Sequence, residues 1–203
     1  MAGIREDGTN AFFEPTLKCY AGAAKFDITP PVGIYTRMWG AALHDCATMV
    51  HRPLFASALC LAESTTAAPR LLLTVDLCVM AFEETEEVIA AVSKALGIAD
   101  RHQIVFTMSH THAGAGILSR DDAFTSLPGG HLIAPYVDTV IDGCVKVATA
   151  ARDALEPAWL TTGRGSCQLA CNRDTWDAKT TATAPPGAGT SVQVRNSSFF
   201  FFS

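Results

Sequence analysis

The chain has 203 residues, of which 49% are hydrophobic, and it carries a formal net charge of −5. This length suits one domain with a sizeable core. No stretch reaches the roughly 18 consecutive apolar residues of a membrane helix, and the acidic balance without a Lys/Arg cluster argues against a nucleic-acid partner. The first eight residues lack the apolar segment of a secretory signal. The cysteines number seven, an odd count, and are scattered along the chain. We therefore expect a reducing, cytoplasmic compartment.

The amino-terminal third of the chain is interpreted as a lead-in and two strands. Residues 1–18 are polar and aperiodic and are expected to be flexible. The segment YAGAAKFDI at 20–28 alternates weakly and predicts a first strand, which two prolines and a glycine in 29–33 terminate. LFASALCLA at 54–62 predicts a second strand. The long aperiodic segment 34–53 is either a functional loop or an irregular surface excursion, and composition does not separate the two.

A nearly continuous apolar run, RLLLTVDLCVM at 70–80, predicts a central strand covered on both faces. Asp76 is its anomaly, because a carboxylate in such a run is costly unless it is paired or close to a metal. We expect it near the strand's end, facing a polar site; a turn or helix-capping aspartate just past the strand is an equal alternative. Cys60 and Cys78, within strand-like runs, are interpreted as small buried hydrophobes.

Two amphipathic helices complete the predicted fold. The apolar stripe in 83–96 predicts a helix that Gly97 ends. Because a strand over 103–109 follows, the order strand, helix, strand indicates a right-handed βαβ unit. A longer helix is expected over 135–155, and one or two strands over 159–171. The pattern as a whole predicts an α/β fold with a mixed, mostly buried sheet and helices packed on it.

Two histidines stand at the end of the 103–109 strand. The alternation of side chains along a strand would put His110 and His112 on one face, at the carboxyl edge of the sheet where ligands of open α/β sheets bind. The glycine-rich segment 113–116 permits a sharp turn behind them. Two such imidazoles can share a metal ion or one substrate atom, although two unrelated loop histidines are an even alternative.

The composition changes abruptly after Lys179. The last stretch, TTATAPPGAGTSVQVRNSSFFFFS, is small, polar and without periodicity before its four phenylalanines. We expect this low-complexity tail, residues 179–203, to be disordered. We interpret it as the product of a lost reading frame, for example through a retained intron, in a longer protein.

Five segments of the chain resemble the neutral/alkaline non-lysosomal ceramidase family in amino-acid sequence, order and spacing. They are AGAAKFDITPPVG at 21–33, HRPLFASALCL at 51–61, LLLTVDL at 71–77, SHTHAGAG at 109–116 and CNRD at 171–174. The resemblance spans roughly residues 20–175 and is to a shorter, less characterised branch. It implies that residues 19–178 are a partial amino-terminal domain of that family, with an incomplete catalytic domain.

The resemblance implies a zinc-dependent amidohydrolase that cleaves an N-acyl amide bond in a small-molecule or lipid amide substrate. Residue by residue, it implies that His110 is a zinc ligand and that His112 helps to hold the oxyanion. It also implies that Arg173 is catalytic, with His51 and Asn172 in the substrate pocket. Without the resemblance, an ordinary surface salt bridge would be the preferred interpretation of Arg173.

The chain departs from the family pattern in two ways. Ala113 and Ala115 replace a serine and a proline of the histidine motif, which puts the loop shape and substrate choice in question. The family's remaining zinc ligands, a histidine, a glutamate and a tyrosine, come from sequence beyond Arg173 and find no match here. Two hypotheses follow: the amino-terminal part of a zinc amidohydrolase, inactive alone, or a non-catalytic binding module with an incomplete metal site.

Overall fold

A computed structural model describes residues 11–12, 17–38, 42–117, 120 and 123–164. The chain divides into two compact units, residues 13–162 and the two terminal segments 1–12 and 163–203. In the terminal unit, β1 (Ala11–Phe12) pairs antiparallel with β7 (Gly163–Arg164). Asn172, Arg173 and the expected tail at 179–203 lie outside the described residues.

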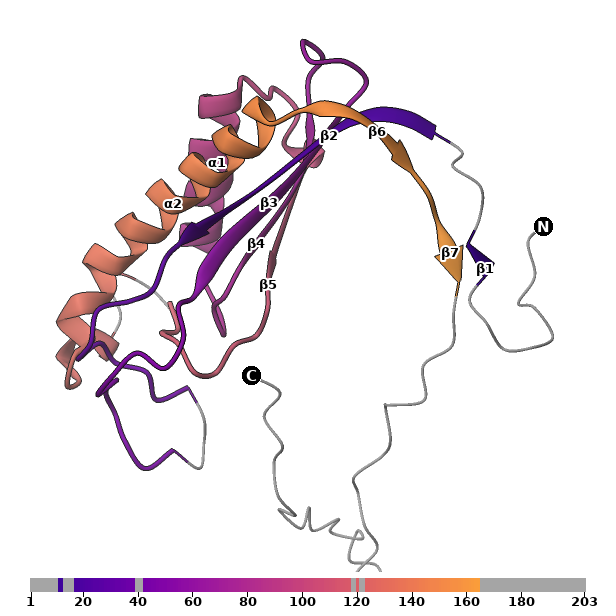
Figure 1. Cartoon of the computed structure of the whole chain (residues 1–203). Coiled ribbons are helices and arrows are strands. Elements are labelled where there is room, and N and C mark those ends of the chain that lie inside the picture. The colour runs from indigo at the N-terminus through magenta and orange to yellow at the C-terminus, as the bar shows by residue number, and fades with distance from the viewer. Residues whose placement is uncertain (1–10, 13–16, 39–41, 118–119, 121–122, 165–203) are drawn as a thin grey trace, which may run out of the picture. The chain divides into compact units, whose positions relative to one another are not determined.

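The larger unit is built on one five-stranded sheet with the order β5-β4-β3-β2-β6 (Figure 1). The strands are β2 (Leu17–Asp27), β3 (Phe55–Ala62), β4 (Arg70–Val75), β5 (Ile104–Met108) and β6 (Glu156–Leu160). β4 and β5 are parallel, whereas the other three pairs are antiparallel. The predicted mixed sheet is therefore confirmed. β2 begins at Leu17, so the last two residues of the expected lead-in belong to the sheet.

Two helices cover one face of this sheet (Figure 1). α1 (Phe82–Leu96) crosses from β4 to the parallel β5 and completes the predicted βαβ unit. Gly97 ends it at φ +67°, as expected of a C′ residue. α2 (Ile133–Asp153) connects β5 to β6 and packs on both α1 and the sheet. Among the described residues, no helix is long and apolar enough to span a membrane.

The core lies between the helices and the sheet. Its fully buried members include, from β4, α1 and α2, Leu71, Leu73, Val75, Val88, Val92, Val137, Val140 and Cys144. Glycine lets α2 approach β2 closely, because a Cβ on Gly22 would lie 2.1 Å from the carbonyl oxygen of Ala151. Tyr136 of α2 donates a hydrogen bond to the Ile28 carbonyl at 2.8 Å, and burial raises the pKa of this phenol far above its ordinary value.

The opposite face of the sheet carries exposed aliphatic side chains. β4 alternates between buried and exposed residues, and Leu72 is 45% exposed. Its register partners are Leu59 of β3, 38% exposed, and Val105 of β5, 53% exposed. The expectation that β4 is covered on both faces was therefore wrong. A continuous apolar run indicates which positions avoid water, but only the tertiary arrangement decides how many faces are covered.

Exposed aliphatic side chains in one cross-strand row favour self-association, because they form a contiguous apolar patch on the surface of the sheet. We expect the triple variant Leu59→Thr, Leu72→Thr and Val105→Thr to be more monomeric than the unmodified chain in sedimentation velocity. Threonine keeps a high strand propensity, so helix and strand content should not change. Leu43→Thr is the matched control, since Leu43 is 92% exposed in a loop. A sharply melting, monomeric unmodified chain would contradict this expectation.

Candidate functional site

The two histidines lie in a turn that continues the parallel pairing of β4 with β5. Past the end of β5, Ser109 donates to the Val75 carbonyl at 3.0 Å and Thr111 to the Leu77 carbonyl at 3.1 Å. Between these two bonds His110 adopts φ +60°, a left-handed conformation that is uncommon for residues with a Cβ but is enriched in histidine. The chain therefore turns at His110 rather than continuing as a strand.

The imidazole rings of His110 and His112 contact each other edge to face, with their centroids 4.6 Å apart. The predicted proximity of the two rings is confirmed. The sequence attributed this proximity to the alternation of side chains along a strand. The strand, however, ends at Met108, and the left-handed turn at His110 brings the two rings together.

Backbone carbonyls orient both rings. Nδ1 of His110 lies 3.0 Å from the carbonyl oxygen of Cys78, and Nδ1 of His112 lies 2.8 Å from that of Met38. A carbonyl can only accept, so each Nδ1 carries the proton and the lone pair of each neutral ring is on Nε2. Metal-binding histidines commonly have this second hydrogen bond, which fixes the tautomer and the ring orientation. Met38 belongs to the long segment 34–53, which supplies one of the two carbonyls.

Cys78 is the third member of the cluster. It is only 6% exposed, and its Sγ lies 3.6 Å from Nδ1 and 3.7 Å from Nε2 of His112. One potential ligand atom from each of Cys78, His110 and His112 lies within 4.8 Å of the others, and among the described residues this is the group that can hold a metal ion. Burial raises the pKa of the Cys78 thiol. Sequence reasoning missed Cys78; its position just past β4, beside the strand that ends in the histidines, was the available signal.

The donor set fits a borderline-soft ion. Imidazole nitrogen and thiolate sulfur are the ligands that zinc takes in proteins, whereas magnesium and calcium prefer oxygen. His110 is exposed and His112 is half-buried, so an ion can reach the cluster from solvent. The described residues therefore fit zinc.

Two glycines let the turn pack against its neighbours. A Cβ on Gly114 would lie 2.6 Å from Cδ1 of Leu54, and a Cβ on Gly116 would lie 2.4 Å from the side chain of Met38. The segment that carries His51, three residues before Leu54, is thereby brought to the turn. His51 itself is exposed and is not part of the Cys78, His110 and His112 group.

Asp76 has a backbone partner. Its carboxylate accepts a hydrogen bond from the N–H of Phe55 at 3.0 Å, and its own N–H donates to the Phe55 carbonyl at 2.9 Å. It lies one residue past β4, as the alternative of a turn aspartate proposed. The carboxylate therefore gives the backbone N–H of the first residue of β3 a hydrogen-bond partner. Within the described part of the chain it belongs to no group that could hold a metal ion.

Comparison with known proteins agrees with this fold. The family model described as neutral/alkaline non-lysosomal ceramidase, N-terminal, matches residues 20–178. The chain belongs to this ceramidase family. Two solved structures, the neutral ceramidase from Pseudomonas aeruginosa and a ceramidase complexed with C2, share its fold with TM-scores of 0.57 and 21% sequence identity. In each case the match covers 70% of this chain and 22% of the ceramidase chain, so it spans about a fifth of their length. No curated protein matches the sequence.

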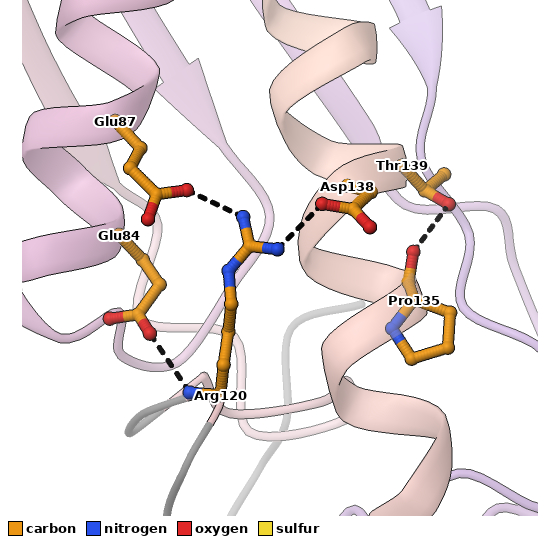
Figure 2. A network of polar contacts seen from close by, with 6 residues as sticks. All are labelled: Glu84, Glu87, Arg120, Pro135, Asp138 and Thr139. Carbon is orange, nitrogen blue, oxygen red and sulfur yellow. Dashed lines mark hydrogen bonds and ion pairs between the residues drawn. The ribbon is translucent and has the colours of Figure 1, made fainter.

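In this ceramidase-family chain, Arg120 ties the segment after the histidines to both helices (Figure 2). Its guanidinium binds Glu87 of α1 at 2.5 Å and Asp138 of α2 at 2.6 Å. Its backbone N–H donates to Glu84, which is 3% exposed, at 2.9 Å. Upstream, Ile117 exchanges backbone bonds with Val79 and Ala81. Ile117 is thus paired with the residues between β4 and α1, and Arg120 is bound to α1 and α2.

Arg120→Ala should lower the free energy of unfolding by about 2 kcal/mol, because one guanidinium holds carboxylates of two helices beside the buried Glu84. Arg101→Ala is the matched control. Arg101 makes two bonds to Glu86 within the exposed surface of α1 and the turn after it, and its loss should cost less than about 1 kcal/mol. Urea unfolding of both variants measures the difference. Equal losses would show that the Arg120 network is an ordinary surface ion pair.

Proposed function

We propose that the chain is the amino-terminal part of a zinc-dependent amidohydrolase that cleaves an N-acyl amide bond. The observation that carries the proposal is the contact of two imidazoles whose Nδ1 atoms are both held by backbone carbonyls. The two carbonyls fix the tautomer and orientation of both rings, as is common for histidines that bind a metal ion. Membership of the ceramidase family supports the same chemistry.

The proposed substrate is a small-molecule or lipid amide. The support is the family description and the names of the two similar structures, a neutral ceramidase and a ceramidase complexed with C2. We also propose a cytoplasmic location, which fits the five described cysteines, all of them free thiols.

Zinc, when bound, polarises an amide carbonyl and lowers the pKa of a bound water molecule from 15.7 to about 7. In the whole enzyme, His110 is proposed to bind the ion through Nε2. The proton of His112 stays on Nδ1, against the Met38 carbonyl, so Nε2 first accepts the proton that the attacking water molecule gives up. The resulting imidazolium then donates to the oxyanion, an effect worth about 3 kcal/mol for a well-placed donor.

The remaining family residues are proposed to handle the substrate. Arg173 offers a planar fork of N–H donors that can orient a polar or anionic group of the substrate. Asn172 and His51 are proposed as pocket residues. The contact of Leu54 with Gly114 supports a place for the His51 segment beside the histidine turn.

A non-catalytic metal-binding module is the second candidate. It is favoured by the count of ligands, since the family's other histidine, glutamate and tyrosine ligands find no match in these 203 residues. Bound zinc without turnover would support this candidate, whereas bound zinc with turnover would support the hydrolase.

We expect the 203-residue chain to show no measurable hydrolysis of ceramide or a fluorescent acyl amide, with or without added zinc. A catalytic zinc site needs three protein ligands that aim an open position at the substrate, and the family's own set is incomplete here. An extended form, in which the carboxyl-terminal part of a ceramidase replaces residues 180–203, is expected to hydrolyse the amide. Zinc-dependent turnover by the short chain would contradict this expectation.

In the extended form, His110→Asn should remove zinc and activity together. Asparagine is chosen because it tolerates the left-handed φ of this position. His112→Ala should keep most of the zinc but lower kcat about 100-fold, because it removes a donor to the oxyanion. Metal content and steady-state kinetics of both variants are the measurements. Equal loss of zinc would assign His112 as a ligand of the whole enzyme.

A further inference from the structure

Among the described residues, Cys78 differs from the other two buried cysteines, Cys60 and Cys144. Cys60 and Cys144 are fully buried members of the hydrophobic core, and burial raises the pKa of Cys144 to about 12. Cys78 is outside that core cluster, and its sulfur faces the ring nitrogens of His112. Packing explains the first two cysteines and leaves the position of Cys78 unexplained.

One residue contacts both histidines. The carbonyl oxygen of Cys78 accepts from Nδ1 of His110, while its Sγ lies beside the ring of His112. This follows from the parallel backbone pairing, because Thr111, between the histidines, donates to Leu77, the neighbour of Cys78. The same residue therefore orients one imidazole and presents a sulfur to the other.

The distances suit a shared ion. Zinc binds sulfur at about 2.3 Å and nitrogen at about 2.0–2.1 Å, so a tetrahedral site separates sulfur from nitrogen by about 3.6 Å. Sγ of Cys78 lies 3.7 Å from Nε2 of His112. One ring nitrogen of His110 lies within 4.8 Å of the ligand atoms of Cys78 and His112, so the three side chains are close enough to share one ion.

We propose that Cys78, His110 and His112 form a complete three-ligand zinc site within this chain. The inference rests on the proposed function only for the identity of the ion. Zinc binding converts the thiol to the thiolate and releases its proton to solvent. Because His112 is then a ligand, its Nε2 is not available to an oxyanion. In this arrangement the 203-residue chain binds zinc but lacks the oxyanion donor that the proposed hydrolase uses.

Cobalt is the probe for the sulfur ligand. The 203-residue chain is titrated with Co²⁺ under anaerobic, phosphine-reduced conditions. We expect one equivalent to bind and to produce a thiolate-to-cobalt charge-transfer band, which Zn²⁺ then abolishes one for one. Cys78→Ser should lose this band and weaken zinc binding by more than the roughly 10- to 100-fold that losing an outer hydrogen-bond partner costs. Cys60→Ala, a buried cysteine of the core, is the matched control and should retain both. An unchanged band or affinity in Cys78→Ser overturns the proposal.

A second measurement needs no variant. Zinc should slow the alkylation of Cys78 in the unmodified chain about tenfold or more, as measured by mass spectrometry of the peptide that contains it. The alkylation rate of Cys46 should not change, since Cys46 bonds to the Pro128 carbonyl away from the cluster. Equal alkylation of Cys78 with and without zinc overturns the proposal. The proposed hydrolase and the proposed Cys78 site can be rejected independently. A thiolate-to-cobalt band in the 203-residue chain, together with no hydrolysis by any extended form, rejects the hydrolase alone. Zinc-dependent hydrolysis with no thiolate band rejects the Cys78 site alone.

Discussion

The parallel pairing of β4 with β5 is the constraint on which the candidate site depends. It places Val75 opposite Met108 and continues past both strand ends through bonds to the carbonyls of Val75 and Leu77. Cys78 and the two histidines come together because they occupy corresponding positions in these two segments. Since parallel neighbours require a crossover, α1 is part of the same arrangement, and the stability of the helix layer and the geometry of the site are linked.

The site is organised by main-chain atoms as much as by side chains. Two carbonyls, from Cys78 and Met38, hold the Nδ1 protons of the histidines, and the proposed chemistry of both rings follows from that choice of tautomer. Met38 comes from a long loop and Cys78 from the end of a strand. Through Met38, the segment after β2 therefore contacts the candidate site. Glycines at 114 and 116 allow the turn to reach these partners without steric conflict.

The two faces of the sheet differ in what covers them. One face forms the core with α1 and α2, which Arg120 joins through carboxylates on each helix. The other presents Leu59, Leu72 and Val105 in one row across three strands. The fold thus combines a well-packed layer, which supports the site, with an apolar surface that is available for association.

The sequence by itself determined the elements, because their signals are local. Alternation and apolar stripes placed β2, β3, β5 and both helices within about three residues of their observed ends, whereas β4 ends at Val75, before the end of the apolar run at Met80. Gly97 marked the end of α1 because its φ of +67° suits glycine. The motif around His110 and His112 and the family resemblance indicated where the site lies.

Contacts between distant segments were decided only by the tertiary structure. Burial predicted that Cys78 avoids water but could not show that its sulfur faces an imidazole, and the apolar run of β4 did not reveal that Leu72 is exposed. The carbonyl of Met38 lies 74 residues before His112, and the partners of Arg120 lie on two helices. No local pattern encodes such pairs, because they depend on how the strands and helices pack.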